Sequence, residues 1–417
     1  MEVLIMGDYV LRCLAGGELL DEHYTLACPH HPGFIRAEYT ATQLTIRNEL
    51  PGMFRFSDWL PVHGSVPTKA TPMTFQNSEL CRKLDLPNLW ITFTGYYPER
   101  GCYVPTGSFK ELEALPTIVR LKEAGGGTLV VASAGNTGRA FAQMSAEFGT
   151  PVVLVVPESS ADKLWTAGWF DHSAVQLITV RGDYTDAIKI ADEICKVPGF
   201  FPEGGGKNIA RRDGMGCVML DAAVRIGKLP DHYFQAVGSG TGGIAAWEAS
   251  LRLIRDSRFG SVLPKLHLSQ NLPFVPMVRA WNEGRDHILD EDMPNAKASI
   301  AKVSAQVLTN RTPPYGIRGG VYDAMRSCGG RMYAVENRDA ANAAALFAEA
   351  ENDIDIDPAA AVAFASLISA NEQGSIGRND TILLNITGGG YQRVKKDCDI
   401  APIKVYTTVD PGEVPAL

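Results

Sequence analysis

Residues 128–149 read TLVVASAGNTGRAFAQMSAEFG, and this stretch decides the fold class. Thr128–Ala132 is a short apolar run that predicts a buried strand, residues 133–138 predict a loop, and the rest predicts a helix. Two more apolar runs, Pro151–Val156 and Val175–Val180, predict further strands near helical sequence. Strands that are apolar along their whole length are buried on both faces, as in a parallel sheet covered by helices. The sequence therefore predicts an α/β fold.

A second set of apolar runs predicts another sheet in the C-terminal half of the chain. The predicted strands are Tyr233–Val237, Lys265–Ser269, Arg331–Val335 and Thr381–Ile386. The Pro- and Gly-rich stretch Val197–Gly206 is the candidate crossover, which predicts two doubly wound lobes with a ligand between them. The predicted division is an N-terminal β-rich module (1–60), a smaller mobile lobe (105–200), and a larger lobe built from 61–104 with 201–417.

The composition is that of an ordinary globular protein: 417 residues, of which 45% are hydrophobic and 21% charged. The formal net charge of −8 disfavours nonspecific binding to nucleic acid. No apolar run reaches the roughly 18 residues that a membrane span needs. The N-terminal segment MEVLIMGDYVLRC has no basic region followed by an apolar stretch and a cleavage site, which predicts a mature cytoplasmic chain with no membrane partner.

The eight cysteines are scattered and none forms a C-x-x-C pair, which indicates a reducing compartment rather than a disulfide framework. Cys13, followed by Cys28-Pro29-His30-His31, has the look of a zinc knuckle that has lost ligands. A tetrahedral structural site wants four ligands, usually in closely spaced pairs, and Cys13 has no partner two residues on. We therefore expect a β-rich module without metal, with a bound metal as the alternative.

The first candidate functional motif is Gly238-Ser239-Gly240-Thr241-Gly242-Gly243, which follows a predicted strand and opens a predicted helix. Glycines let backbone N–H groups close on an anion, and the helix N-terminus adds partial positive charge, so a phosphate is the natural ligand. The string also matches the dinucleotide fingerprint, but the next strand ends in Ser269-Gln270 rather than an acid. A plain tight turn is the other alternative.

The second motif, Ser133-Ala134-Gly135-Asn136-Thr137-Gly138, also lies between a predicted strand and a helix. Its N–H groups can bind a substrate carboxylate at the helix N-terminus, and its Ser, Asn and Thr side chains add hydrogen-bond donors. The alternative is an ordinary capped helix start, for which the same residue types are common.

The third and fourth motifs are Pro105–Lys110 (PTGSFK) and Asn385–Gly390 (NITGGG). Lys110 stands at the start of a predicted helix among small and aromatic residues, where desolvation lowers the pKa of an amine and a Schiff base can form. A solvated charge is the alternative reading of this lysine. Thr387 follows a predicted strand and can present its hydroxyl to a ring bound between the lobes, although a plain Gly-rich turn would look the same.

In their order along the chain, the four motifs resemble those of pyridoxal 5′-phosphate (PLP) enzymes of fold type II, from about residue 60 onward. The N-terminal module and Asp357-Pro-Ala-Ala-Ala resemble threonine synthases. The segments PTGSFKELEALP, SAGNTGRAFA and FFPEGGGKNIARRDGMG, with those around Arg318 and Tyr391, are instead similar to the cysteate synthases of methanogenic archaea. At the last motif this chain reads Thr-Gly-Gly-Gly-Tyr-Gln, where a threonine synthase has Thr-Gly-x-Gly-Leu-Lys.

The resemblance implies a role for each motif. Lys110 holds PLP and, once displaced by substrate, moves the α-proton; Asn136 bonds the 3′-oxygen of the ring and Thr387 meets the pyridine nitrogen. The phosphate of PLP lies on Gly238, Ser239, Gly240, Thr241 and Gly242. The substrate is expected on Ser133, Ala134, Gly135, Thr137 and Arg318.

The resemblance also implies a β-replacement in coenzyme M biosynthesis: O-phospho-L-serine and sulfite give L-cysteate and phosphate. Because these are anions on an acidic protein, the site must be locally basic. The candidate cations are Arg139, Lys207, Arg211, Arg212, Arg318 and Arg393. The alternatives are a threonine synthase that acts on O-phosphohomoserine with water, and a PLP-fold protein that binds an anionic amino acid without turnover. A homo-oligomer is expected from the fold.

Overall fold

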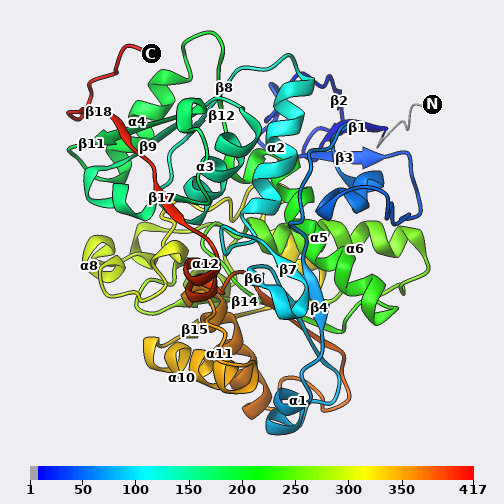
Figure 1. The fold of residues 1–417 in the computed structure, drawn as a ribbon. Helices are drawn as coiled ribbons and strands as arrows, with labels where there is room; N and C mark the ends of the chain where they lie inside the picture. Colours follow the sequence, from blue (N-terminus) through cyan, green and yellow to red (C-terminus); the bar gives the residue numbers. More distant parts are fainter. Residues whose placement is uncertain (1–7) are drawn as a thin grey trace.

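The computed structural model describes residues 8–417. The prediction of a chain without a leader rests on residues 1–13, of which residues 1–7 lie outside the described residues. The chain starts with a small antiparallel sheet in the order β2-β1-β3, formed by β1 (Tyr9–Cys13), β2 (Leu19–Leu20) and β3 (Ile35–Tyr39). Alternate residues of β3 are buried, as expected of a strand with one face on a core. Figure 1 shows this module beside the smaller lobe, at the top of the view.

A five-stranded parallel sheet forms the core of the smaller lobe, in the order β12-β8-β9-β11-β18. Its strands are β8 (Thr128–Val131), β9 (Val152–Pro157), β11 (Val175–Val180), β12 (Phe200–Pro202) and β18 (Val405–Val409), and its helices are α2 (Glu111–Glu123), α3 (Asn136–Phe148) and α4 (Tyr184–Ile194). Val153 and Val155 of β9 pack in a cluster with α4, whereas Leu154 joins the main core with Phe141 of α3. Alternate residues of one strand therefore serve two helix layers, which explains the unbroken apolar run.

A six-stranded sheet in the order β15-β14-β13-β16-β5-β4 forms the core of the larger lobe, and only the pairing of β4 is antiparallel. The strands are β4 (Met73–Phe75), β5 (Leu89–Phe93), β13 (His232–Ala236), β14 (Lys265–Asn271), β15 (Arg331–Val335) and β16 (Ile382–Ile386). Four long helices accompany this sheet: α5 (Ile209–Ile226), α6 (Thr241–Asp256), α10 (Asn337–Ala350) and α11 (Pro358–Glu372). Helix α11 packs on β13, β14, β15 and β16, with α10 outside it (Figure 1).

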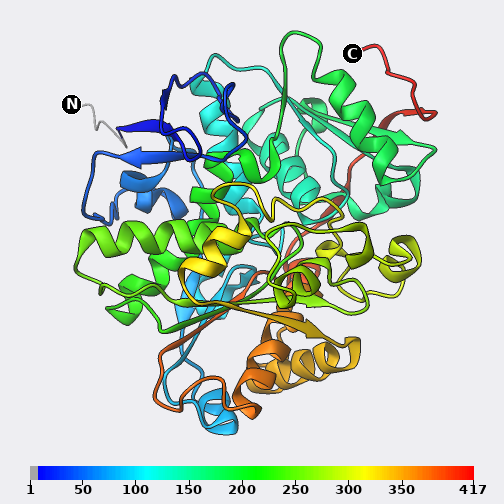
Figure 2. The same ribbon diagram turned by 180° about the vertical axis from the view of Figure 1, so that it is seen from behind.

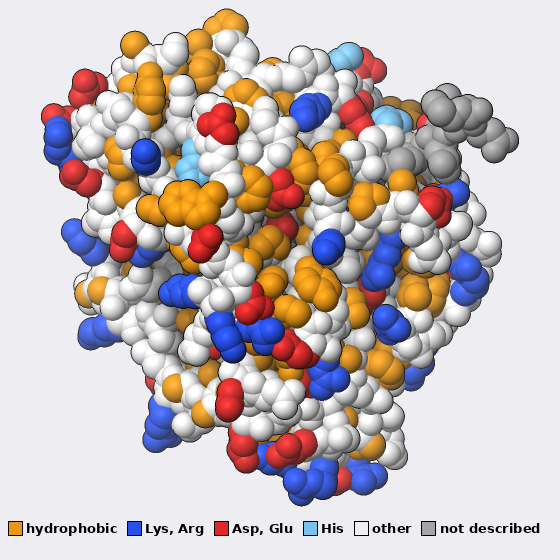
Figure 3. Space-filling model, in the orientation of Figure 1, with side chains coloured by type: hydrophobic (Ala, Val, Ile, Leu, Met, Phe, Trp, Pro, Cys, Tyr) orange, Lys and Arg blue, Asp and Glu red, His pale blue; other side chains and the backbone are white. Residues whose placement is uncertain are grey.

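Shorter elements lie between and after these strands and helices. They are α1 (Ser78–Leu84), β6 (Tyr96–Tyr97), β7 (Cys102–Tyr103), β10 (Trp165–Ala167), α7 (Pro276–Asn282), α8 (Ala296–Ile300), α9 (Val321–Ser327), α12 (Tyr391–Asp397) and β17 (Ile400–Pro402), with 3-10 helices that include η1 (Gly52–Trp59), η5 (Gly205–Lys207) and η7 (Gln306–Leu308). Among the helices of residues 8–417, none is long and apolar enough to cross a membrane. On the face shown in Figure 3, Lys and Arg side chains are interspersed with Asp and Glu.

The end of the chain departs from the predicted division. Residues 201–417 were expected in the larger lobe, but β17 pairs with β10, and β18 pairs with β11 at the edge of the smaller sheet. Figures 1 and 2 show this return from opposite sides. The strand β18 (VYTTV) is exposed over its first residues, so it carries no buried-strand pattern that would have predicted it. The α/β prediction itself is confirmed.

Candidate active site

Three of the four motifs lie at the carboxyl ends of parallel strands. Residues 133–138 follow β8, residues 238–243 follow β13, and Thr387 directly follows β16. Parallel strands place these ends at one edge of each sheet, where doubly wound folds bind their ligands. The two sheets therefore carry the motifs as predicted.

The turn that carries Lys110 pairs directly with the motif around Thr387. The Phe109 N–H donates to the Thr387 carbonyl at 2.9 Å, and the Gly389 N–H donates to the Gly107 carbonyl at 2.9 Å. Ser108 and Gly388 form an antiparallel bridge between these bonds. A Cβ atom on Gly388 would lie 2.6 Å from the Gly107 carbonyl oxygen, so only glycine permits this approach. The lysine is thus fixed by backbone bonds to a segment far away in sequence.

The amine of Lys110 is largely removed from solvent, with 19% of the side chain exposed. Its Nζ lies 3.2 Å from a carboxylate oxygen of Glu113, 4.0 Å from the sulfur of Met215 and 4.8 Å from the ring centre of Phe109. Burial lowers the pKa of Lys110, Arg211 lowers it as well, and Glu113 acts in the opposite direction. A lowered pKa makes the neutral, nucleophilic amine available at lower pH.

Glu113 links this amine to both lobes. Its side chain is fully buried and lies 3.0 Å from Nε of Arg211, which forms a second ion pair of 2.8 Å with Glu203. The hydroxyl of Thr137, in the first turn of α3, donates to the other oxygen of Glu113 at 2.9 Å. A buried carboxylate needs such partners, because an unpaired charge away from water is costly. Glu113 and Glu203 were not among the residues predicted from the sequence, although Glu113 stands three residues after Lys110, at contact spacing on a helix.

Asn136 belongs to a second network that joins the lobes. Its amide donates to the Asp357 carboxylate at 3.1 Å and its oxygen accepts from Arg139 at 2.8 Å. The hydroxyl of Tyr391 donates to Asp357 at 2.8 Å and accepts from Arg139 at 3.1 Å. Burial raises the pKa of Tyr391 well above its ordinary value, and the Asp357 carboxylate adds to the effect, so this hydroxyl stays protonated.

Arg139 carries this network to the Lys110 turn, because its Nε donates to the Thr106 carbonyl at 3.0 Å. Its guanidinium lies 4.7 Å and 5.0 Å from the ring centres of Trp165 and Tyr391. The roles of Asp357 and Tyr391 were missed as well. No local spacing indicates them, since both meet Asn136 only through the fold.

The glycine loop before α6 has the construction of an anion site. Among the described residues, the N-cap residue Gly240 offers no side-chain cap for α6, and the first turn holds no acidic residue. The Thr241 N–H makes a long hydrogen bond of 3.4 Å to the Ser239 hydroxyl, which an anion at this helix start would replace. Gly240 has a φ of +82°, and a Cβ there would collide with Val321. A Cβ on Gly242 would collide with the side chain of Gln235. Packing against Val321 and Gln235 therefore demands glycine at these two positions of the loop.

Val307 lies where the two glycine-containing loops face each other. A Cβ on Gly238 would lie 2.8 Å from the carbonyl oxygen of Val307, and one on Gly135 would lie 3.5 Å from its side chain. The loop of the smaller lobe and the loop of the larger lobe thus meet the same residue of η7. This proximity is what a ligand that uses both loops requires.

The remaining candidate residues lie in different surroundings. Thr387 is 6% exposed, whereas Arg318 has a side chain that is 65% exposed and is paired with Asp323. The buried Arg212 is paired with Glu248, and Arg393 with Glu99 and Asp397. Lys207 is exposed. Of the six cations considered from the sequence, the structure brings Arg139 and Arg211 to the surroundings of Lys110 and Asn136.

Comparison with known proteins agrees with this geometry. Residues 95–388 match the family described as pyridoxal-phosphate dependent enzyme. The chain is 84% identical over 412 residues to the cysteate synthase of Methanocorpusculum labreanum, covering 99% of this chain and all of that protein. It is 54% identical over 413 residues to the cysteate synthase of Methanosarcina acetivorans, covering 98% of this chain and 99% of the relative.

Two solved structures share the fold at low sequence identity. Maize serine racemase superposes with a TM-score of 0.58 at 13% identity, covering 78% of this chain and 92% of the racemase. Diaminopropionate ammonia lyase from Escherichia coli gives 0.57 at 15% identity, covering 78% and 86% of the two chains. The fold type II prediction is thereby confirmed.

Proposed function

Because the chain belongs to the pyridoxal-phosphate-dependent enzymes and, within them, to the cysteate synthases, we propose that it converts O-phospho-L-serine and sulfite to L-cysteate and phosphate. The observation that carries the proposal is the setting of Lys110. Its partly desolvated amine stands on a turn bonded to the Thr387 segment, with Glu113 joining it to the Asn136 helix. A protein that only binds amino acids has no use for such a lysine.

The residues present fit PLP as the cofactor. Lys110 supplies the amine, and the glycine loop with the uncapped start of α6 suits a phosphate. In the proposal the phosphate is held by Gly238–Gly242, Asn136 bonds the 3′-oxygen and Thr387 meets the pyridine nitrogen. Bound PLP supplies an electron sink for the pair released at the substrate α-carbon.

In the proposed reaction one bond at the β-carbon is exchanged for another. The carbon–oxygen bond to phosphate breaks, a carbon–sulfur bond to sulfite forms, and the α-proton is removed and later returned. Lys110 is the base and acid for this proton, since burial favours its neutral form and Glu113 lies within hydrogen-bond distance when it is charged. Its ammonium form is therefore met by a fixed carboxylate.

Substrate anions are proposed to bind on the smaller lobe. The backbone N–H groups of residues 133–137 at the start of α3, with the hydroxyl of Ser133, suit the substrate carboxylate. Thr137 contributes through its backbone N–H, because its hydroxyl donates to Glu113. Arg139, which bonds Asn136, and Arg211, which pairs with Glu113 near Lys110, are proposed to balance the phosphate and sulfite charges. Arg318, being exposed and paired with Asp323, is kept as an outer contact for an entering anion. A cytoplasmic location, a homo-oligomeric state and a place in coenzyme M biosynthesis also belong to the proposal.

One set of incubations tests the proposal. The protein with PLP receives O-phosphoserine with sulfite, O-phosphoserine with sulfide, or O-phosphohomoserine alone, and the amino-acid products are separated. Cysteate in the first incubation supports the proposal, threonine in the third alone contradicts it, and no product at all indicates a binder. Lys110→Ala is expected to abolish both cysteate formation and the visible absorbance of bound PLP. Colour that survives this substitution would show that another residue holds the cofactor.

A further inference from the structure

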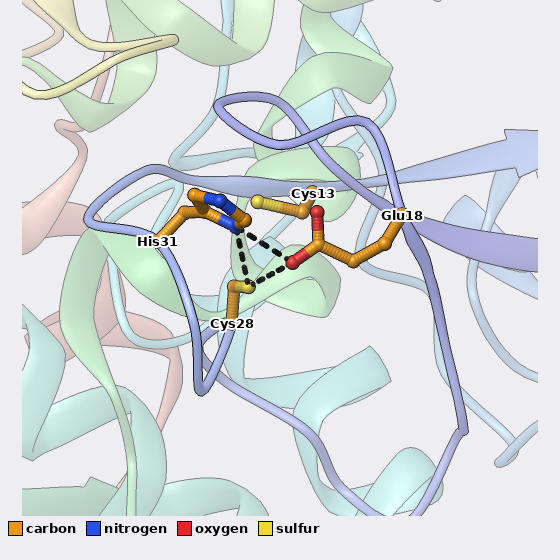
Figure 4. Close-up of side chains that lie close together, drawn as sticks. All are labelled: Cys13, Glu18, Cys28 and His31. Atoms are coloured by element: carbon orange, nitrogen blue, oxygen red, sulfur yellow. Dashed lines mark hydrogen bonds and ion pairs between the residues drawn. The ribbon is translucent and has the colours of Figure 1, made fainter.

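The N-terminal module brings four metal-ligand side chains together. Cys13, Glu18, Cys28 and His31 each offer one ligand atom, and these atoms all lie within 4.8 Å of one another. Figure 4 shows the four side chains pointing toward a common centre from β1, the turn after it, and the loop before β3. We propose that these residues form a structural zinc site of this protein, made of side chains other than those assigned to PLP and its substrate.

The donor set is the first argument. Two thiolates, one imidazole nitrogen and one carboxylate oxygen are all zinc ligands, and four of them make the closed tetrahedral shell of a structural site. The sequence favoured a module without metal because Cys13 has no cysteine two residues on. The fold supplies the missing ligand from Glu18, which no Cys/His pattern indicates.

The present spacing is that of a compact, hydrogen-bonded set of ligands. Glu18 Oε1 lies 2.8 Å from both Cys28 Sγ and His31 Nδ1, and these two atoms lie 3.9 Å apart. Around a tetrahedral zinc, neighbouring ligand atoms lie about 3.3 to 3.8 Å apart, since the bonds are about 2.0 to 2.3 Å long. The separations of the four ligand atoms, which run from 2.8 Å to at most 4.8 Å, therefore have to change by no more than about 1.5 Å for all four to bind. Binding releases the two thiol protons to solvent, because the thiolate is the ligand form.

The backbone around the four side chains also favours metal binding. The Gly16 N–H donates to the sulfur of Cys13 at 3.3 Å, and the His30 N–H donates to that of Cys28 at 3.4 Å. Such N–H groups stabilise a thiolate and orient it, as outer partners do in metal sites. A Cβ on Gly16 would collide with both Glu18 and His31, so glycine is required for these two side chains to converge.

The site also has a structural task. The segment between Glu18 and Cys28 reaches the smaller lobe, where the Tyr24 ring lies 5.8 Å from Phe201 and Glu22 pairs with the buried Arg120 at 2.8 Å. The residues after His31 reach the larger lobe, where the Phe34 N–H donates to the Arg318 carbonyl at 2.9 Å. A metal bound by the four side chains would hold both segments, the one between Glu18 and Cys28 and the one after His31, in position against the two lobes.

The test uses the full-length protein with PLP bound. After passage through a chelating resin, metal analysis is expected to find about one zinc per chain. The variants Cys28→Ser and His31→Ala should each lose most of this zinc. Cys81→Ser is the matched control, since Cys81 is a half-buried thiol outside the cluster, and it should retain the wild-type content. Zinc that remains in both ligand variants would place it elsewhere and overturn the proposal.

A second measurement on the wild-type chain keeps the proposal testable where a variant fails to fold. Chelator-stripped protein is titrated with Co²⁺, and the difference spectrum is expected to show thiolate charge transfer with the intense visible bands of a tetrahedral site. Bound metal should also protect Cys13 and Cys28, but not Cys81, from alkylation mapped by peptide mass spectrometry. Purified protein without metal and without cobalt–thiolate bands, or with Cys13 and Cys28 joined as a disulfide, contradicts the proposal.

Discussion

Replacing Gly388 by alanine tests whether the pairing of two distant segments positions Lys110. The new Cβ would lie 2.6 Å from the Gly107 carbonyl oxygen, where an ordinary contact needs about 3.4 Å. The two paired segments must therefore move apart by about 0.8 Å, since backbone hydrogen bonds hold both of them in place. Gly388 does not have a positive φ, so the change acts through space and not through backbone strain.

The expected consequence is larger for activity than for stability. Overpacking of this size costs about 1 to 3 kcal/mol of the free energy of unfolding, whereas a catalytic group misplaced by about 1 Å costs about 100-fold in rate. We expect kcat/KM for cysteate formation to fall by about 100-fold while the protein keeps its fold and its PLP absorbance. Gly64→Ala is the control, because its Cβ would approach only side-chain atoms, at 3.3 Å and beyond. Activity of Gly388→Ala within a few-fold of wild type would refute the idea that this pairing positions the lysine.

Three further substitutions test the site. Glu113→Gln removes the carboxylate that raises the pKa of Lys110 against the lowering by burial. More of the amine is then neutral at a given pH, so the pH midpoint for recombination of the apoprotein with PLP, followed by visible absorbance, should move to lower pH. An unchanged or raised midpoint contradicts this role. Tyr391→Phe removes a hydroxyl that bonds Asp357 and Arg139, and the free energy of unfolding should fall by about 1.5 to 3 kcal/mol. Denaturant titration measures this loss, with Tyr406→Phe, at an exposed tyrosine, as the control. An equal loss of unfolding free energy in both variants contradicts a stabilising role for the network. Gly240→Ala forces a side chain into a left-handed residue against Val321 and should weaken PLP binding by at least about 10-fold; wild-type affinity in an equilibrium titration would place the phosphate elsewhere.

The sheets and the main motifs could be predicted because their signals are local. Apolar runs such as Val175–Val180 reproduce the observed strand bounds, since a strand buried on both faces has no polar positions to confuse the pattern. A glycine-containing loop that follows such a strand is also a local signal, because it indicates the edge of the sheet where a ligand binds. The order of the four motifs along the chain then indicated the family, which no single motif indicates.

What could not be predicted depends on contacts between distant segments. Asp357 and Tyr391 meet Asn136 only when both lobes are assembled, and the backbone bonds between Phe109 and Thr387 leave no mark on side-chain pattern. Glu18 is in the same position, because a glutamate in a turn is an ordinary surface residue until two cysteines and a histidine lie around it. The substrate roles given to residues 133–137 and Arg318 stay predictions.

The last strand of the chain has a consequence for how the protein is made. The edge of β11 is complete only when β18 pairs with it, yet β11 ends at Val180 and β18 begins at Val405. At a synthesis rate of roughly 5 to 20 residues per second, this edge waits on the order of 10 to 50 s for its neighbour on the ribosome. An unpaired edge invites pairing with other chains. A chain that terminates before Val405 would therefore leave β11 as an unpaired edge that can aggregate, whereas in the full-length chain β18 covers β11 and becomes the edge strand of the sheet.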